Sequence, residues 1–312
     1  MSNSLGPRRR LSVHFALTLT DNIKESFGSV YASEDTIKSL KDVMLPVLDP
    51  EAFKIGVLSR YGSLGILLYG PPGTGKTLLV RALAKQVNAR VLAISGADIR
   101  SPYLGGGEKK IQRMFRYARQ HHPCIIFVDE ADSLFRSRSA DCANRGCRAD
   151  LDQFLLEMEG IHSDSATSPV VIAASNRPFD MDEAVLRRLG RRILVDIPDA
   201  TGREEILKIL LEGETTEVSL AEVARSTADY MGSDLRDLVY QAAIMAVREM
   251  YEAAPAQGGS GTGQSSAKSS GARRVLRQKH FDSARREIRP APKSELVAKI
   301  RDFHCKLSAE KK

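Results

Sequence analysis

The run Gly70-Pro-Pro-Gly-Thr-Gly-Lys76-Thr77 has the composition of a loop that binds phosphate groups. It has the spacing G-x-x-x-x-G-K-[ST] and lies between an apolar, strand-like run and a helical pattern, as that spacing requires. Glycines let the backbone curl so that successive N–H groups face phosphate oxygens, and the positive end of the helix dipole adds to the attraction. Lys76 would place a charge on the β- and γ-phosphates, and the Thr77 hydroxyl would ligate Mg²⁺.

The alternative for this run is a plain glycine turn in front of a helix. The expected nucleotide contacts are Gly70, Pro71, Pro72, Gly73, Thr74, Gly75, Lys76, Thr77 and Leu78.

Two acids follow the apolar run that begins at Cys124. A carboxylate at the end of a buried strand is costly unless it meets a cation. We therefore expect Asp129 in the Mg²⁺ shell and Glu130 beside the attacking water, which it would hold and polarise. Asn176 ends another apolar run and could orient the same water, although alone it would be an ordinary strand-to-turn asparagine. Together with the glycine-rich run that ends in Lys76 and Thr77, these residues favour an ATPase.

Four arginines lie between Ala184 and Arg192. A charge run of this kind is usually a solvated face. In front of a strand of a nucleotide hydrolase, however, such arginines can stabilise γ-phosphate charge in a neighbouring subunit, an effect worth about 10³–10⁵ in rate.

The chain around these residues alternates between short β-rich runs and helical patterns. This alternation predicts an open parallel α/β sheet with crossover helices. The predicted strands are 66–69, 91–94, 125–128, 170–174 and 193–197, and the helices between them include 77–87 and 108–120. The expected α/β domain spans residues 21–200.

After Pro198 the pattern is helical only, with predicted helices at 202–211, 220–226, 233–253, 277–288 and 294–307. These residues predict a small all-helical domain made of 201–253 and 273–312, the last part being a C-terminal helix. Residues 254–272 are rich in Gly and Ser, which predicts a flexible insertion because they bury too little surface to offset their ordering entropy.

Composition limits the other possibilities. The net charge of +7 divides into +8 over residues 271–312 (13 basic, 5 acidic) and −1 over the rest (33 basic, 34 acidic). A uniformly basic nucleic-acid surface is therefore not supported. No apolar stretch approaches the 18 residues of a membrane span, so membrane contact would need another segment or partner. Four cysteines without a secretory signal predict reduced thiols, and Cys142 with Cys147 alone is poor evidence for zinc.

The first 20 residues contain no acid and carry Arg8, Arg9 and Arg10. That composition is typical of an organelle-targeting segment. The apolar residues at every second position instead have the period of a strand. They are Leu11, Val13, Phe15, Leu17 and Leu19. Both interpretations stay open.

In this order and spacing, the motifs resemble the classical AAA ATPases over residues 21–307. The runs that carry the resemblance are Asp129-Glu130-Ala-Asp132, Ser-Asn176-Arg-Pro-Phe-Asp180 and Gly232-Ser-Asp-Leu235. Residues 184–199 look most like the mitochondrial outer-membrane group, which extracts mislocalised tail-anchored proteins. The katanin, spastin and ESCRT-disassembly ATPases are the next most similar group.

The resemblance implies a role for each matching residue. Lys76 and Thr77 match the Walker A pair, Asp129 and Glu130 the Walker B pair, and Asn176 sensor 1. Arg188 and Arg191 match the two arginine fingers, with Arg187 a rival for the first. Gly232 and Ser233 match the lid position that closes over the nucleotide. Tyr103 and Leu104 match the first pore loop, whose aromatic residue grips a threaded polypeptide.

Two departures from the family pattern stand out. Gly106 and Gly107 follow the pore-loop glycine where an acidic residue is usual, which predicts a looser loop. Residues 27–32 replace the usual Asp-Ile-Gly-Gly, so the contact on the adenine side is expected to differ.

The sequence thus predicts a Mg²⁺-ATP hydrolase, hexameric, that pulls on protein substrates and resides at the mitochondrion or otherwise in the cytoplasm. Three rivals remain: a severing or disassembly ATPase acting on microtubules or membrane-remodelling filaments, a nucleotide-regulated binding module with little turnover, and a nucleic-acid motor.

Overall fold

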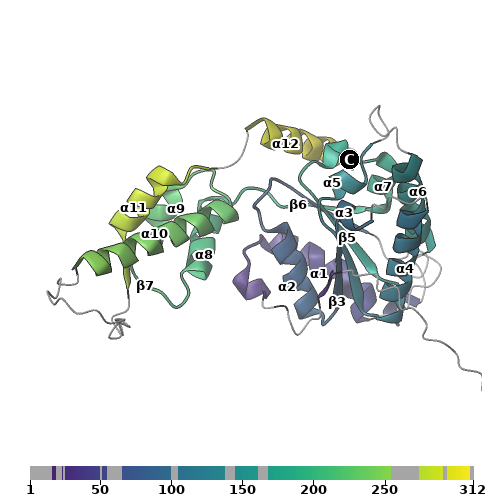
Figure 1. The fold of residues 1–312 in the computed structure, drawn as a ribbon, viewed down its shortest axis with the longest axis horizontal. Coiled ribbons are helices and arrows are strands. Elements are labelled where there is room, and N and C mark those ends of the chain that lie inside the picture. The colour runs from purple at the N-terminus through teal and green to yellow at the C-terminus, as the bar shows by residue number, and fades with distance from the viewer. Residues whose placement is uncertain are drawn as a thin grey trace, which may run out of the picture.

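The computed structural model describes residues 16–18, 23, 25–49, 51–54, 65–99, 105–137, 145–160, 168–253, 274–290 and 294–309. These residues form an α/β lobe and a mainly helical lobe, joined by the segment after β6 and bridged again by the C-terminal helix α12 (Figure 1).

The α/β lobe is built on a six-stranded sheet with the order β1-β3-β4-β5-β2-β6. The strands are β1 (Ala16–Thr18), β2 (Ile66–Tyr69), β3 (Arg90–Ile94), β4 (Cys124–Val128), β5 (Val170–Ser175) and β6 (Arg191–Leu194). All neighbouring strands are parallel except β1, which pairs antiparallel with β3. The predicted parallel sheet is confirmed, and residues 16–18 of the N-terminal extension are strand.

Alternate side chains of each central strand enter different hydrophobic cores, as the two-residue period of a strand requires. Ile66 and Leu68 pack with α1 (Glu34–Leu48) and α2 (Lys76–Gln86) on one face. Leu67 and Tyr69 pack with α4 (Gly106–Gln120) and α6 (Arg145–Gly160) on the other. Burial on both faces explains why these strands are continuously apolar. The shorter helices are α3 (Gly96–Ile99), α5 (Ala131–Leu134) and α7 (Glu183–Arg188).

The second lobe has its own core, made by α8 (Ala200–Leu210), α9 (Leu220–Ser226), α10 (Gly232–Ala253) and α11 (Gln278–Glu287). The expectation of a purely helical domain is wrong in one respect. Strands β7 (Thr215–Glu217) and β8 (Val275–Arg277) form a small parallel ribbon. The three β7 residues are exposed, so they lack the apolar signal by which a strand is recognised in sequence.

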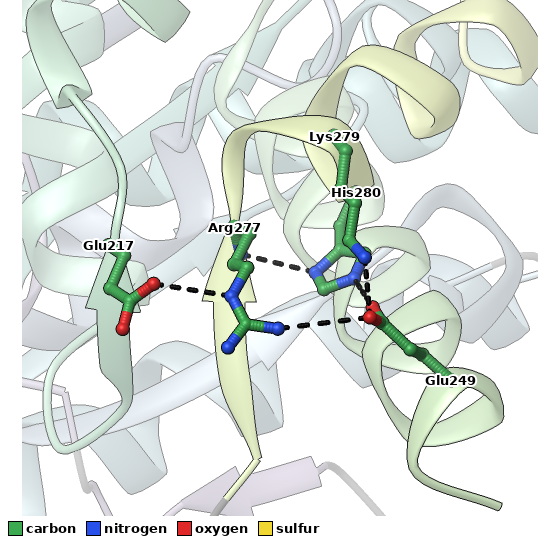
Figure 2. A network of polar contacts seen from close by, with 5 residues as sticks. All are labelled: Glu217, Glu249, Arg277, Lys279 and His280. Carbon is green, nitrogen blue, oxygen red and sulfur yellow. Dashed lines mark hydrogen bonds and ion pairs between the residues drawn. The ribbon is translucent and has the colours of Figure 1, made fainter. Parts of the chain in front are cut away.

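A polar network ties the ribbon to α10 and α11 (Figure 2). The ring of His280, which is 4% exposed, accepts a hydrogen bond at Nδ1 from the Arg277 N–H (3.1 Å) and donates from Nε2 to Glu249 (2.6 Å). The Arg277 side chain adds a bond to Glu217 at 3.2 Å. Hydrogen bonds from Lys279 and His280 lower the pKa of Glu249 to about 2.

The last helix, α12 (Ser294–Ala309), leaves the helical lobe and packs on the α/β lobe (Figure 1). Ile300 is buried in the core on the α4–α6 face of the sheet. Phe303 meets the ring of Tyr69 edge-on at 5.5 Å, and the Tyr69 hydroxyl lies 2.7 Å from His304 Nδ1. Helix α12 therefore anchors on the residue that directly precedes Gly70. Within the described residues, every helix is too short or too polar to cross a bilayer.

Candidate nucleotide site

The loop between β2 and α2 curls because three of its glycines adopt backbone angles that other residues rarely take. Gly73 and Gly75 have φ of +82° and +88°. A Cβ atom on Gly70 would lie 2.0 Å from the Val195 carbonyl oxygen, so the close approach of the residue that follows β6 requires glycine there. A Cβ atom on Gly75 would meet nothing within 4 Å. The loop therefore surrounds open space at the N-terminus of α2, which is where an anion binds.

Lys76 carries its cation into this loop. The residue is 8% exposed, and its Nζ donates to the carbonyl oxygens of Gly70 (2.9 Å) and Pro71 (2.7 Å). Burial lowers its pKa to about 8, against the opposing influence of Asp129 and Asp132. A buried cation bonded only to neutral oxygens is a poor resting arrangement and a good one for receiving a triphosphate.

Thr77 and Asp129 lie together, as two ligands of one magnesium ion should. The Thr77 hydroxyl donates to Asp129 Oδ2 at 3.1 Å, and the Glu130 N–H donates to Asp129 Oδ1 at 2.9 Å. One carboxylate and one hydroxyl beside a phosphate site suit Mg²⁺, which usually takes few protein ligands and completes its shell with phosphate and water.

Glu130 and Asn176 both line the same pocket. Glu130 is exposed to it and has a left-handed backbone, with φ of 49°. The Asn176 Oδ1 atom is buried and has no hydrogen-bond partner among the described residues. Leaving such an atom unpaired costs about 1–3 kcal/mol, so its position fits a water or phosphate contact in the nucleotide complex.

Two residues, Ser175 and Asp132, support Asn176, and the sequence motifs assign a role to neither. The Ser175 hydroxyl donates to Asp132 Oδ1 at 2.7 Å, and the Arg177 N–H donates to the same hydroxyl at 2.9 Å. Asp132 was visible in the acidic run. Its partner on the next strand could not be recognised without the sheet order.

The pocket has a volume of about 370 Å³ and lies between the two lobes. Besides the loop and the two strand ends, its lining comes from the N-terminal arm and the helical lobe, by way of Ser29, Val30, Tyr31, Ile206, Ile209, Leu210, Gly232, Ser233 and Arg236. The Ser233 N–H donates to the Gly73 carbonyl at 3.2 Å. Gly232 and Ser233 thus line the same pocket as the glycine loop.

Tyr31 packs directly on the start of α8. A Cβ atom on Gly202 would lie 2.6 Å from the Tyr31 ring, so this contact requires glycine. Burial raises the pKa of Tyr31, and Asp199 and Glu205 raise it further. The departure noted at residues 27–32 therefore lies at this wall of the pocket.

The candidate finger arginines lie at the other end of the sheet. Arg191 pairs in register with Ile66, whereas the phosphate loop follows Tyr69, about 10 Å further along the strand. The Arg188 carbonyl lies beside Gly65, just before β2. Arg188 forms an ion pair with Glu159. Arg191 forms one with Asp42, with 3.6 Å between Arg191 Nη2 and Asp42 Oδ2. Among the described residues that line the pocket, neither arginine is present.

The structure therefore brings together most of the predicted nucleotide residues and separates the arginines from them. Pro72, Gly73, Thr74, Gly75 and Leu78 line the pocket, while Gly70 and Pro71 hold Lys76 through their carbonyls. Tyr103 and Leu104 lie outside the described residues. The predicted strand 193–197 begins and ends earlier, at Arg191–Leu194, because its pairing follows β2 rather than its own apolar run.

Comparison with known proteins identifies the family of this chain. Residues 66–197 match the "ATPase family associated with various cellular activities (AAA)" and residues 217–256 the "AAA+ lid domain". The chain is therefore an AAA ATPase domain with its lid, and the family binds ATP with Mg²⁺.

The similar proteins are diverse. The chain is 37% identical over 292 residues to the cell division cycle protein 48 homolog of Archaeoglobus fulgidus, covering 91% of this chain and 38% of that one. It is 42% identical over 212 residues to spastin of Anopheles gambiae, covering 67% and 25%. The crystal structure of the FIGL-1 AAA domain in complex with ADP superposes with a TM-score of 0.74 at 28% identity, covering 93% and 92%. The chain spans less than half of the length of either of these two curated relatives.

Proposed function

We propose that this protein hydrolyses ATP with Mg²⁺ at the pocket between its two lobes. The observation that carries the proposal is the buried Lys76 cation in a curled glycine loop, next to the Thr77–Asp129 pair. Lys76 and the loop N–H groups bind the phosphates, and Thr77 and Asp129 would hold Mg²⁺, which would neutralise charge on the phosphates. Glu130 orients and polarises the attacking water, and Asn176 fixes that water from the neighbouring strand.

The separation of the arginines from the pocket supports a site shared by two copies. Because Arg188 and Arg191 lie at the amino end of β2, they reach the γ-phosphate of a neighbour rather than that of their own chain. A head-to-tail contact of this kind closes into a ring, and a hexamer agrees with the resemblance. Before assembly, the ion pairs with Glu159 and Asp42 hold the two arginines on the surface.

A Glu130→Gln substitution tests the assignment. The variant should bind Mg²⁺-ATP with wild-type affinity, because the amide keeps the size of the side chain, and should lose turnover by about 10²–10⁴, the usual value of a general base. Asp282→Asn, an exposed change on α11, is the matched control and should leave both quantities unchanged. Wild-type turnover in the Glu130→Gln protein would refute the role.

We further propose that hydrolysis drives remodelling of protein substrates, with Tyr103 and Leu104 as the gripping loop. The family and the similarity to the cell division cycle protein 48 homolog support this. The similarity to spastin favours the severing or disassembly alternative as the second candidate. Complexes stalled by Glu130→Gln would separate the two by the identity of the proteins they retain.

A nucleotide-regulated binding module is the third candidate. A single-turnover assay decides against it if ATP is cleaved on the bound enzyme. The mitochondrial outer membrane is proposed as the location from the resemblance of residues 184–199, and imaging the tagged protein in cells tests it.

A further inference from the structure

Glu130 and Asn176 lie beyond the paired part of the two strands that carry them. Glu130 follows β4, and Asn176 follows β5, its neighbour in the sheet. Among the described residues, the last paired positions of these strands are Val128 and Ala173. The sheet ladder therefore does not by itself fix the separation of the two side chains that would hold one water.

A side-chain hydrogen bond joins the two strands beyond that point. The Ser175 hydroxyl donates to Asp132 Oδ1 at 2.7 Å. Asp132 is the second residue of α5 and lies two positions after Glu130. Ser175 is the residue directly before Asn176. The bond therefore connects the turn that presents Glu130 to the backbone that presents Asn176.

Ser175 contacts three other groups from a position that is 1% exposed. A hydroxyl has one proton to donate, and this one goes to Asp132. The hydroxyl oxygen accepts the Arg177 N–H at 2.9 Å, and the Ser175 carbonyl accepts the Gly70 N–H at 3.3 Å. Although Ser175 lines the pocket, its hydroxyl is engaged by protein groups rather than offered to the nucleotide.

The segment that carries Asp132 is held at both ends by the core. Ala131 and Phe135, on either side of Asp132, are 0% and 1% exposed and belong to the core on the α4–α6 face. The Glu130 backbone is left-handed, with φ of 49°, a conformation that other residues than glycine keep where their surroundings hold it. Because the segment is packed in this way, the position of Asp132 fixes that of Glu130.

We propose that Asp132 and Ser175 are positioning residues for hydrolysis. Their hydrogen bond holds Glu130 and Asn176 at one separation, so that both side chains reach the same attacking water. The proposal rests on the proposed function, because it takes the roles of Glu130 and Asn176 as given. It implies that the bond matters for the chemical step and not for the grip on the triphosphate, which Lys76 and the glycine loop supply.

A Ser175→Ala substitution removes the bond and keeps the backbone contacts of this residue. The kcat should fall by about 10², the usual cost of a misplaced catalytic group, while ATP affinity and sedimentation in Mg²⁺-ATP should match wild type. Ser175→Thr restores the hydroxyl and should recover most of the turnover. Ser308→Ala, which removes an exposed hydroxyl on α12, is the matched control and should leave kcat unchanged. Wild-type kcat in the Ser175→Ala protein, or a parallel loss of ATP binding, overturns the proposal.

Substitutions of Asp132 separate the hydrogen bond from the charge. Asp132→Asn keeps an oxygen that can accept the Ser175 hydroxyl, so turnover at saturating ATP should stay close to wild type. Asp132→Ala removes the acceptor and should lose as much turnover as Ser175→Ala does. Equal losses in the two Asp132 variants would show that the negative charge near Lys76 matters instead of the bond, and would overturn the proposal.

Combination with Asn176→Ala tests whether the bond acts through the side chains that hold the water. Residues that act as a unit show losses that do not multiply. Ser175→Ala should therefore lower kcat much less in an Asn176→Ala protein than in the wild type. An undiminished loss would indicate an independent effect on the fold and would contradict a positioning role.

The two proposals fail in different ways. If wild-type protein does not hydrolyse ATP, or if Glu130→Gln turns over normally, the proposed function falls. If Glu130→Gln is inactive while Ser175→Ala and Asp132→Ala are fully active, the positioning role falls alone.

Discussion

Lys76 brings a positive charge into a pocket where the surrounding protein has displaced water. Two carbonyl oxygens compensate it only in part, and burial holds its pKa at about 8 instead of its usual 10.5. A triphosphate would restore the preference for the charged form, because an opposite charge in contact raises the pKa of a cation. Binding and protonation at this residue are therefore linked.

That linkage predicts proton uptake when Mg²⁺-ATP binds near pH 8. The free protein has Lys76 about half protonated there, since its pKa is about 8, and the complex has it fully protonated. ATP affinity should fall as pH rises from about 8, the pKa of Lys76 in the free protein, towards 10.5, the usual pKa of a lysine. Calorimetry at pH 8 in buffers of different ionisation enthalpy measures the uptake. Lys76→Arg, which stays charged at this pH, is the control and should show no proton uptake at this side chain. Equal uptake in both proteins would show that Lys76 is not the group that takes up the proton.

At the scale of elements, the pocket depends on how α8 meets the N-terminal arm. Gly202 is the point of closest approach, because the Tyr31 ring lies where a Cβ atom would be. The start of α8 is fixed independently by Asp199, whose side chain accepts the Gly202 N–H at 2.7 Å. The helix cannot easily move away to make room.

Gly202→Ala should therefore displace Tyr31 and weaken nucleotide binding. Overpacking at a tight site costs about 1–3 kcal/mol, which would lower ATP affinity by about tenfold or more if most of it is expressed in the complex. Titration with a fluorescent ATP analogue measures the effect. Thr201→Ala, an exposed change in the same turn, is the control. Unchanged affinity in the Gly202→Ala protein would show that Tyr31 is no part of the nucleotide wall.

His280 supports a different element, the β7–β8 ribbon. Since Nδ1 accepts a backbone N–H, the ring proton sits on Nε2 and reaches Glu249 (Figure 2). His280→Ala leaves the Arg277 N–H without this acceptor and opens a cavity, for a loss of about 2–4 kcal/mol in the free energy of unfolding of the lid.

Hydrogen exchange of β8 and α11 amides measures that loss. Lys279→Ala removes another contact to Glu249 from an exposed position, and it should change stability by less than about 1 kcal/mol. Equal effects of the two substitutions would mean that the buried ring contributes no more than a surface ion pair.

How far the sequence predicts these elements depends on whether their signal is local. Strands such as Cys124–Val128 are apolar at every position, and the glycine-lysine loop is contiguous, so both were recognisable in the sequence. The ribbon was missed because Thr215–Glu217 is polar and its partner lies across the Gly/Ser-rich insertion. Ile206 and Leu210 have ordinary helical spacing, and only the packing of the lobes places them at the pocket as well as at the lid core.

At the scale of the whole molecule, the lid is connected to the α/β lobe twice. The chain enters it after β6 and returns through α12, whose Phe303 and His304 contact Tyr69 just before the phosphate loop (Figure 1). The lid is thus attached to the α/β lobe beside Gly70, which follows β2 and lies next to Val195, just after the end of β6. This arrangement offers a direct mechanical path from the nucleotide to the lid.

The two ends of β2 carry the two halves of the active site. The phosphate loop follows its carboxyl end, and the candidate finger arginines lie at its amino end. A single chain cannot bring them together without disrupting the sheet. We therefore infer that one ATP is hydrolysed by residues of two copies.

Mixing two inactive proteins tests whether two copies share one site. Lys76→Ala removes the phosphate grip and keeps the arginines, whereas Arg188→Ala/Arg191→Ala keeps the grip and removes the arginines. Each should be inactive alone. Mixed in equal amounts, they should recover about a quarter of the wild-type turnover per site, because random assembly places an intact pocket beside intact arginines at about one contact in four. No recovery in mixed assemblies of normal size, or full activity of the arginine variant alone, would contradict a shared site.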